Sequence, residues 1–491
     1  MSGTYKQTVK MLLLLITVGM FAILASCGDK DGDRGDPAKN TETAEVPAAI
    51  IEELFPYPEH DFGGAAIKIL ARRDGKEGEG QDYDDLYVES EIGESLNDAV
   101  YRRNAAVEHK YNFTIDITYN IDPSALTAKN IKADDNPYHI VQEKLMFLQS
   151  NLATNNYLLD MRKISTITLE APWYNQNAIK DLSILKKVTS IGGDMTISDK
   201  AGVMVTIFNK KFVVDNGLED MYKIVDEGRW TLDKLRELMQ ATSRDLNGDG
   251  KMTLKDDQWG LKVEPYAGWF FSVSSGSRLA DLDENGIPYL TLATPKYLSD
   301  LEKIMDIMFD KDNRAPYGPT VEDYVDTFTE NRNFIQVNSI STLLLMRAMD
   351  DDYGLIPLPK YDETQKDYLT AMSPWASRFV AIPTTCREAE MVGAIIDAMS
   401  RESVNTVMPA YYDNLLHNKI ARDEESIEML KMIFSTVVYD LGSVYDWNGM
   451  WGLQARFIER EKRDYVSYYE KSIDKIQQAI EKTVEQMQNS D

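Results

Sequence analysis

The residues with the clearest metal-binding spacing lie between Asp245 and Asp256, in the run DLNGDGKMTLKD. Side-chain oxygens at positions 1, 3 and 5, a glycine at position 6 and a carboxylate at position 12 reproduce the pattern of an EF-hand calcium loop. The predicted ligands are Asp245, Asn247, Asp249, the carbonyl of Lys251, Thr253 and Asp256. We expect a structural Ca²⁺ here. A metal-free acidic turn is the alternative, and Asp257 could replace Asp256, whose side chain is shorter than the usual glutamate.

Aromatic side chains form the second group with possible chemistry, since the chain has 7 tryptophans and 26 tyrosines. A sugar stacks its C–H faces on aromatic rings and needs hydrogen-bond partners for its hydroxyl groups. The candidates for ligand contact are Trp375, Trp173, Tyr174, Trp269, Trp447 and Trp451, with Asn338, Ser339, Asp199 and Arg73 as polar candidates. Core packing is the alternative for each aromatic residue. Trp230 and Trp259 are expected in the core.

Catalytic motifs are not apparent, so no catalytic residue is expected. The 4 histidines are dispersed, and the sequence contains no His-Glu-x-x-His, Gly-x-Ser-x-Gly or phosphate-binding glycine motif. The 80 acidic residues guarantee chance carboxylate pairs, so the sequence carries no specific signal for glycoside hydrolysis. A secreted carbohydrate-active enzyme therefore stays an alternative.

The charge balance argues against nucleic acid as a partner. The formal net charge is −27, which repels phosphate backbones. Only two cysteines are present, Cys27 and Cys386, so an internal disulfide is not expected if Cys27 is modified.

The N-terminal segment reads as a secretory signal. Lys6 and Lys10 precede the apolar stretch Met11 to Leu24, and Leu24-Ala25-Ser26-Cys27 follows as a small-residue cleavage site. These four residues resemble the bacterial lipobox, in which the cysteine receives a lipid after cleavage. We expect a signal peptide over 1–26 and a lipidated Cys27 with a flexible linker over 27–47. An ordinary signal peptide with an incidental cysteine is the alternative.

Apolar runs and helical patterns alternate through the remaining chain. Ala66 to Ala71 and Val203 to Phe208 read as strands, and helices are expected after Thr231 and from Thr294-Pro295. Residues 281 to 292 read as a hairpin that turns at Asn285-Gly286. This alternation predicts the α/β class.

The segment from Ile207 to Gly260 resembles bacterial extracellular solute-binding proteins of family 1, the capture subunits of ABC importers. The matching features are Asn209-Lys210-Lys211, Asn216-Gly217, Trp230-Thr231, the acidic loop over 245–249 and Trp259-Gly260. The resemblance continues in Tyr353 to Pro359 and in Ser373-Pro374-Trp375.

This resemblance implies two α/β lobes joined by crossover segments, with a hinge and a ligand cleft between them. Lobe 1 would hold 48–198 plus 376–400, and lobe 2 would hold 199–375 plus 401–491 with the calcium loop. The crossovers would fall near Met195 to Asp199 and Ala371 to Trp375.

The function implied is capture rather than chemistry. We expect a monomeric lipoprotein on the extracellular face of the cell membrane that delivers a carbohydrate, such as an oligosaccharide, to an ABC permease. The alternatives are the carbohydrate-active enzyme and a binding protein that senses its ligand for a membrane kinase. Peptides and other polar solutes also remain open as ligands.

Overall fold

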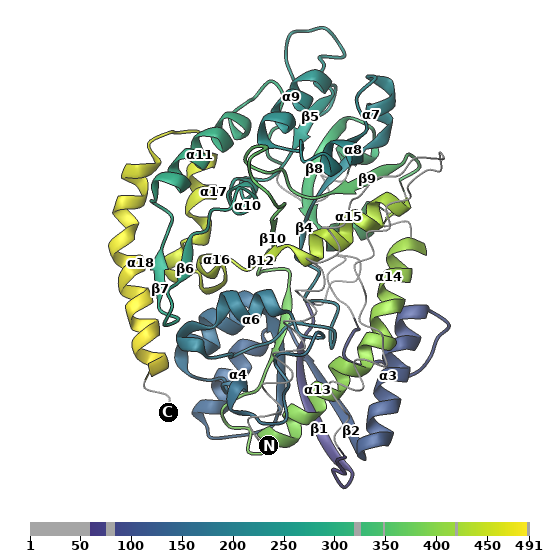
Figure 1. Ribbon diagram of the computed structural model, residues 1–491, viewed down its shortest axis with the longest axis vertical. Coiled ribbons are helices and arrows are strands. Elements are labelled where there is room, and N and C mark those ends of the chain that lie inside the picture. The colour runs from purple at the N-terminus through teal and green to yellow at the C-terminus, as the bar shows by residue number, and fades with distance from the viewer. Residues whose placement is uncertain (1–58, 75–83, 319–325, 347–348, 418–420, 489–491) are drawn as a thin grey trace, which may run out of the picture. The chain divides into compact units, whose positions relative to one another are not determined.

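The computed structural model describes residues 59–488 except 75–83, 319–325, 347–348 and 418–420 (Figure 1). The predicted signal peptide, Cys27 and the linker lie outside the described residues. Within the described ranges, no helix combines the length and the apolar character that a membrane crossing requires.

The first lobe is built on a four-stranded sheet with the order β11-β3-β1-β2 (Figure 1). The strands are β1 (Ala65–Arg72), β2 (Phe113–Asn120), β3 (Ile140–Lys144) and β11 (Arg378–Ala381). β1 runs parallel to β2 and β3, while β11 runs antiparallel to β3. Ile67, Ile69 and Leu70 of β1 are fully buried, which explains why this apolar run forms a central strand.

Helices surround the first sheet. They include α3 (Ser95–Tyr111), α4 (Pro123–Lys132), α6 (Gln176–Leu182), α13 (Ala389–Asn405) and α14 (Val407–His417), with the short segments α5 (Leu145–Phe147), η1 (Leu148–Leu152), η2 (Ala153–Asn155), η3 (Met161–Lys163) and η4 (Ile184–Lys186). Both α13 and α14 pack against α3. Residues 401–417 therefore lie with the first sheet, although the predicted lobe boundary was at residue 400.

The second lobe contains a four-stranded sheet with the order β5-β8-β4-β9. Its strands are β4 (Met204–Asn209), β5 (Trp259–Lys262), β8 (Asn333–Ser339) and β9 (Tyr353–Ile356). All residues of β4 are buried, as its apolar sequence predicts for a strand covered on both faces. The accompanying helices are α7 (Lys210–Asp215), α8 (Met221–Asp226), α9 (Leu232–Thr242), α10 (Ala267–Ser274), α11 (Pro295–Met308), η5 (Ile340–Met346) and α15 (Glu424–Ser435).

Three crossover segments join the lobes. The first spans residues 195–203, the second runs from β10 (Thr370–Ala371) to Arg378, and the third contains β12 (Val437–Val438). β10 pairs with β12 in parallel, and the backbone N–H of Ser373 donates to the Gly202 carbonyl at 2.8 Å. A Cβ on Gly202 would lie 2.4 Å from the carbonyl oxygen of Ser373, so these crossovers are in close contact.

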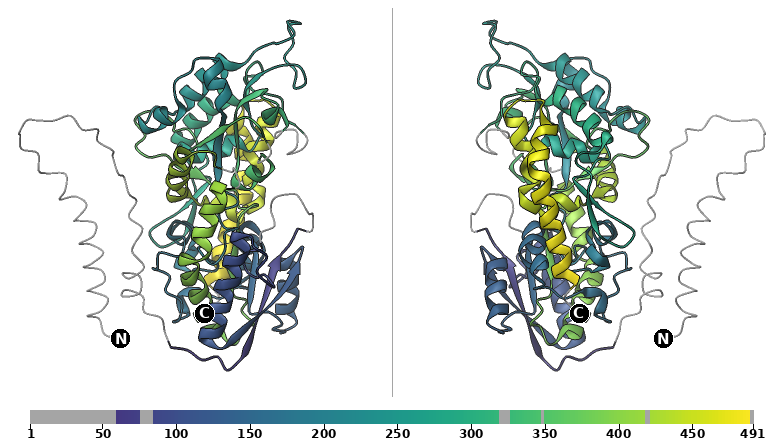
Figure 2. Two further views of the ribbon diagram at one scale, coloured as in Figure 1. Left: turned by 90° about the vertical axis from the view of Figure 1, so that its right-hand side faces the viewer. Right: turned by 90° about the vertical axis from the view of Figure 1, so that its left-hand side faces the viewer.

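The C-terminal segment contacts both lobes. It consists of α16 (Leu441–Tyr445), η6 (Trp447–Gly449), α17 (Trp451–Glu459) and α18 (Tyr465–Gln488). In Figure 2, α18 is the long yellow helix, and it contacts η2 and η4 in the first lobe, while α17 packs against α10 in the second. A hairpin of β6 (Ala280–Leu282) and β7 (Pro288–Leu290) also reaches η4, where the Leu185 N–H donates to the Gly286 carbonyl at 2.8 Å.

Candidate functional site

Trp375 is the most exposed tryptophan of the described chain, and a set of charged residues surrounds it. Its side chain is 44% exposed and lies in the second crossover, three residues before β11. The Trp375 and Phe147 rings meet in a T-shaped arrangement with 5.3 Å between centroids, and the Lys144 ammonium lies 4.1 Å from the centre of the Trp375 ring. A large exposed aromatic ring held in place by neighbours is suited to stack on a ligand.

Asp74 is the acidic centre of this group, and three cations contact it. Its carboxylate lies 2.7 Å from Arg72, 3.2 Å from Arg378 and 3.5 Å from Lys144. Burial alone would raise the pKa of Asp74, but the hydrogen bond from Arg72 and the three positive charges lower it. Asp74 is therefore an ionised acceptor with 22% of its side chain exposed, which is suited to accept hydrogen bonds from hydroxyl groups.

Glu143 holds Arg72 from the buried side. Its carboxylate lies 2.9 Å from the Arg72 guanidinium and also accepts the Ser124 N–H at 3.2 Å. Burial raises the pKa of Glu143, and the charge of Arg72 opposes that effect. The ion pair with Glu143 holds the Arg72 side chain in place, and Arg72 in turn holds the Asp74 carboxylate.

The sheet explains why these residues meet. Arg72 ends β1 and Lys144 ends β3, two neighbouring parallel strands, while Arg378 begins the antiparallel β11 beside them. All three therefore lie at one edge of the first sheet, the carboxyl edge, where ligands bind in open α/β sheets. We call Arg72, Asp74, Lys144, Trp375 and Arg378 the Trp375 cluster.

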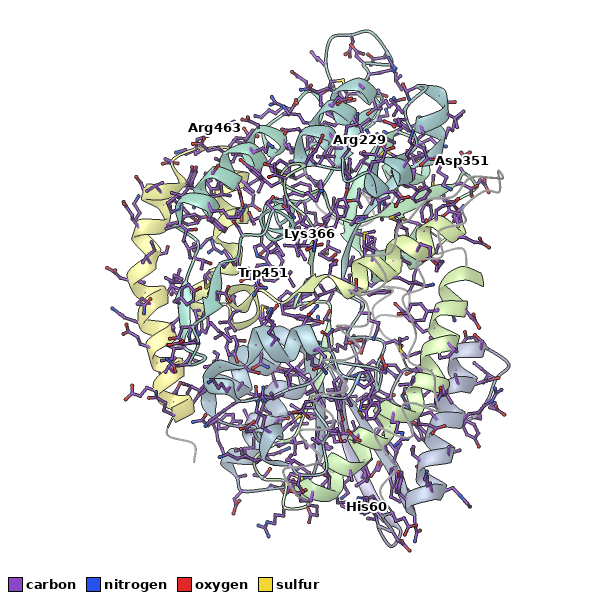
Figure 3. All side chains as sticks on the ribbon, in the orientation of Figure 1. His60, Arg229, Asp351, Lys366, Trp451 and Arg463 are labelled. Carbon is purple, nitrogen blue, oxygen red and sulfur yellow. The ribbon has the colours of Figure 1, made fainter. Side chains whose placement is uncertain are left out.

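A second aromatic group lies in the other lobe. Tyr266 directly before α10 and Trp451 at the start of α17 pack at 4.8 Å between ring centroids, and Trp451 meets Trp269 at 5.7 Å. Trp451 is half-buried, and its indole N–H has no hydrogen-bond partner among the described residues. Figure 3 shows Trp451 at mid-height, between His60 near one end of the view and Arg463 near the other. We call Tyr266 and Trp451 the aromatic platform.

Four of the predicted ligand residues lie in the core instead. The Tyr174 hydroxyl donates to Asp397 at 2.9 Å, and the Trp173 indole lies 3.4 Å from the same oxygen. The Trp269 indole N–H donates to Asp440 at 2.7 Å. Trp447 stacks on Tyr445 and donates to Thr483 at 2.9 Å. Each of these side chains is almost fully buried and its polar atom has a partner within the protein, so we leave them out of the site.

The polar candidates are also engaged within the protein. Asn338 and Ser339 end β8, and the Asn338 side chain accepts the Thr342 hydroxyl at 2.8 Å. Asp199 is buried against Lys200 at 3.0 Å. Arg73 forms an ion pair with Asp84 and lies over the Tyr119 ring. Trp230 and Trp259 are fully buried, as predicted.

The predicted calcium loop folds around its own backbone N–H groups. Asp245 accepts from Gly248 and Gly250, each at 2.7 Å, and Asn247 accepts from Asp249 at 2.9 Å. Asp257 closes the loop, because its carboxylate accepts the N–H groups of Leu246 and Thr253, while Asp256 is exposed. The oxygen ligands present suit Ca²⁺. Among the described residues, no three acidic, histidine or cysteine side chains are gathered as a metal site.

Two cavities lie away from these aromatic groups. One of about 380 Å³ lies between α6 with η4 and the β6–β7 hairpin, where Asp181 and Arg278 form an ion pair at 3.2 Å. The other, of about 410 Å³, lies beside α7 and is lined by Lys211 and Arg244 among others. Neither cavity is lined by Trp375 or Trp451. We place the candidate site by the exposed ring and its charged neighbours, because ligands of open α/β sheets bind at the carboxyl edge.

No protein-family model matches the chain, and no curated protein sequence matches it. Solved structures do. A cyclo/maltodextrin-binding protein in complex with maltotetraose is 12% identical, covers 87% of this chain and 97% of its own, and superposes with a TM-score of 0.56. The chain has the same two-lobed fold as this sugar-binding protein. The apo form of RafE from Streptococcus pneumoniae is 13% identical with a TM-score of 0.54, and it covers 87% of this chain and 97% of its own.

A third structure extends the comparison. The maltose/maltodextrin-binding domain MalE from Bdellovibrio bacteriovorus, bound to maltotriose, is 15% identical, covers 86% of this chain and 99% of its own, and has a TM-score of 0.50. At these identities the likeness concerns the fold, and the predicted α/β two-lobed architecture is confirmed.

The sequence did not single out Asp74, Lys144 or Arg378. One signal was present, because Arg72-Arg73-Asp74 directly follows the apolar run of β1 and charged residues after a buried strand mark a sheet edge.

Proposed function

We propose that this chain is the carbohydrate-binding component of an ABC importer, anchored by a lipid on Cys27. The observation that carries the proposal is that the exposed Trp375 ring and the ionised Asp74 both contact Lys144 at the carboxyl edge of the first sheet. The fold supports it, since one neighbour is in complex with maltotetraose and another is bound to maltotriose. The ligand class proposed is an oligosaccharide.

In this proposal, Trp375 and the aromatic platform contact the ligand from opposite lobes. Trp375 would stack on the C–H face of a sugar ring, while Asp74 would accept two neighbouring hydroxyl groups. Tyr266 and Trp451 would contact the ligand from the second lobe. A ligand that touches both lobes stabilises the closed arrangement selectively, and a permease can then recognise the loaded protein. Capture of this kind needs no bond cleavage, so we propose a non-enzymatic role.

The test is binding calorimetry with maltotetraose and a wider glycan panel, with analysis of the recovered glycan. We expect unchanged glycan to be recovered and Trp375→Ala to weaken binding by roughly fivefold or more, since a stacked ring contributes about 1 kcal/mol or more. Tyr289→Ala is the matched control, because Tyr289 is an aromatic residue with similar exposure, 47%, on β7. Cleaved products would favour an enzyme, and binding of peptides alone would remove the carbohydrate assignment.

The anchor is tested by cell fractionation. Cys27→Ser should move the protein from cells to the medium, because the lipid is attached at that thiol. Cys386→Ser is the control. Cys386 is buried in the folded protein, so this substitution should leave the protein on cells. Retention of the Cys27→Ser protein would contradict the anchor.

We also propose a structural Ca²⁺ in the loop from Asp245 to Asp257. Asp245, Asn247 and Asp249 would supply side-chain oxygens, and Asp257 or Asp256 the closing carboxylate. Adding about 1 mM calcium to chelator-treated protein should raise its Tm. Asp245→Asn should abolish the rise, whereas Asp283→Asn, at an exposed acidic turn in the β6–β7 hairpin, should keep it. An unchanged Tm would contradict the calcium site.

A further inference from the structure

Asp440 connects the third crossover to the second lobe's aromatic residues. It lies two residues after β12 and caps the N-terminus of α16, and its side chain is 1% exposed. Its carboxylate accepts the Trp269 indole N–H at 2.7 Å, the Leu279 N–H at 3.1 Å and the Gly442 N–H at 3.0 Å. One buried carboxylate therefore joins α10, the start of β6 and α16.

Trp269 connects Asp440 to the aromatic platform through a ring contact. Its ring meets Trp451 edge to face at 5.7 Å, and Trp451 packs on Tyr266 at 4.8 Å. The helices that carry these rings are in close contact, because a Cβ on Gly268 of α10 would lie 2.2 Å from the Ile458 side chain of α17. A shift of Trp269 therefore forces a shift of Trp451.

The backbone next to Asp440 is tied to the hinge. Val437 and Val438 pair with Thr370 and Ala371, in the same crossover that carries Trp375. The Tyr439 N–H donates to Asp181 of the first lobe at 3.2 Å. A change in the angle between the lobes must therefore act on the segment that holds Asp440.

We propose that Asp440 is a positioning residue: it holds Trp269 and thereby sets the aromatic platform for the ligand as the hinge moves. This rests on the proposed function, because it assigns a role to the same binding site. Asp440 does not touch the ligand. Its effect comes from four N–H groups that converge on one carboxylate, since the Ala280 N–H also donates at 3.5 Å. An asparagine side chain cannot satisfy this set because its NH₂ group donates.

The binding test compares two aspartates that each accept a tryptophan indole N–H, the buried Asp440 and the half-buried Asp397. Asp440→Asn should weaken maltotetraose binding by roughly tenfold, the size expected for losing a hydrogen bond to a charged group. Asp397→Asn is the matched control, since Asp397 also accepts a tryptophan indole N–H but lies on α13 in the first lobe, where its donors are Trp173 and the Tyr174 hydroxyl. It should lower the Tm and leave maltotetraose affinity within about twofold. Equal losses of affinity in the two variants, or no loss in Asp440→Asn, would overturn the proposal.

A ligand-free measurement separates this proposal from the proposed function. In protein labelled with fluorotryptophan, ¹⁹F resonances are assigned by single Trp→Phe variants. Asp440→Asn should shift the resonances of Trp269 and Trp451, and Asp397→Asn should shift that of Trp173. If wild-type protein binds no glycan, the proposed function fails, and an unmoved Trp451 resonance in Asp440→Asn would overturn the positioning role by itself.

Discussion

Gly286 at the tip of the β6–β7 hairpin gives the sharpest test of how the two lobes contact each other. Its φ is +78°, and an added Cβ would lie 2.9 Å from the backbone nitrogens of Leu185 and Lys186 in the first lobe. Gly286→Ala must therefore both strain the turn and push the hairpin away from η4. A non-glycine residue in this left-handed conformation costs about 1–2 kcal/mol. Loss of the Leu185 to Gly286 hydrogen bond adds about 1 kcal/mol, giving a total of about 2–3 kcal/mol.

Gly64 provides a control with nearly the same backbone. Its φ is +77°, but a Cβ there would meet no atom within 4 Å. Gly64→Ala should therefore lower the free energy of unfolding by the conformational cost alone, about 1–2 kcal/mol. Urea denaturation with linear extrapolation resolves the expected difference of about 1 kcal/mol between the variants. Equal destabilisation by the two substitutions would refute the idea that the hairpin is docked on η4.

Three further predictions follow from single side chains. Asp74→Asn should reduce maltotetraose affinity in calorimetry, because the amide loses one acceptor for sugar hydroxyls; unchanged affinity would remove Asp74 from the site. Burial raises the pKa of both Asp194 and Asp440 from 3.8 to about 6, so the native state binds their protons more tightly than the unfolded state does. The free energy of unfolding should therefore rise as pH falls from 7 to 5, by about 1 kcal/mol per group, and Asp194→Asn should remove about half of this rise in urea titrations at the two pH values. Thr231→Ala should lower stability by about 1 kcal/mol in the same assay, because Thr231 caps α9 by accepting the Lys234 N–H, and Thr231→Ser should restore it.

Local sequence signals predicted many of the elements. Thr231 caps α9, and Thr294 with Pro295 begins α11, as their residue types indicated. The hairpin turns at Asn285-Gly286, because the turn needs a residue with positive φ and glycine supplies it. The sequence predicts these elements correctly because helix capping and turn formation depend on residues only a few positions apart.

The site itself was predictable only in part. Trp375 was selected as a candidate and is exposed, but Trp173, Trp269 and Trp447 look similar in sequence and are buried. Burial of a tryptophan depends on which distant segment covers it, and composition does not report this. The partners of Asp74 come from β3 and β11, far along the chain, so no local spacing connects them. The third crossover was missed because β12 has only two residues, too few for a periodic pattern.

The pairing of β11 with β3 also has a consequence for folding kinetics. Phe379 faces Glu143 across this ladder, so the first sheet cannot be completed until the chain has been made well past the whole second sheet. Contacts of such long sequence separation slow folding, because loop closure must precede the gain from pairing. During synthesis the first lobe would stay incomplete while the second is already available to fold. For a chain with a predicted secretory signal, this delay would help to keep the N-terminal part unfolded until export.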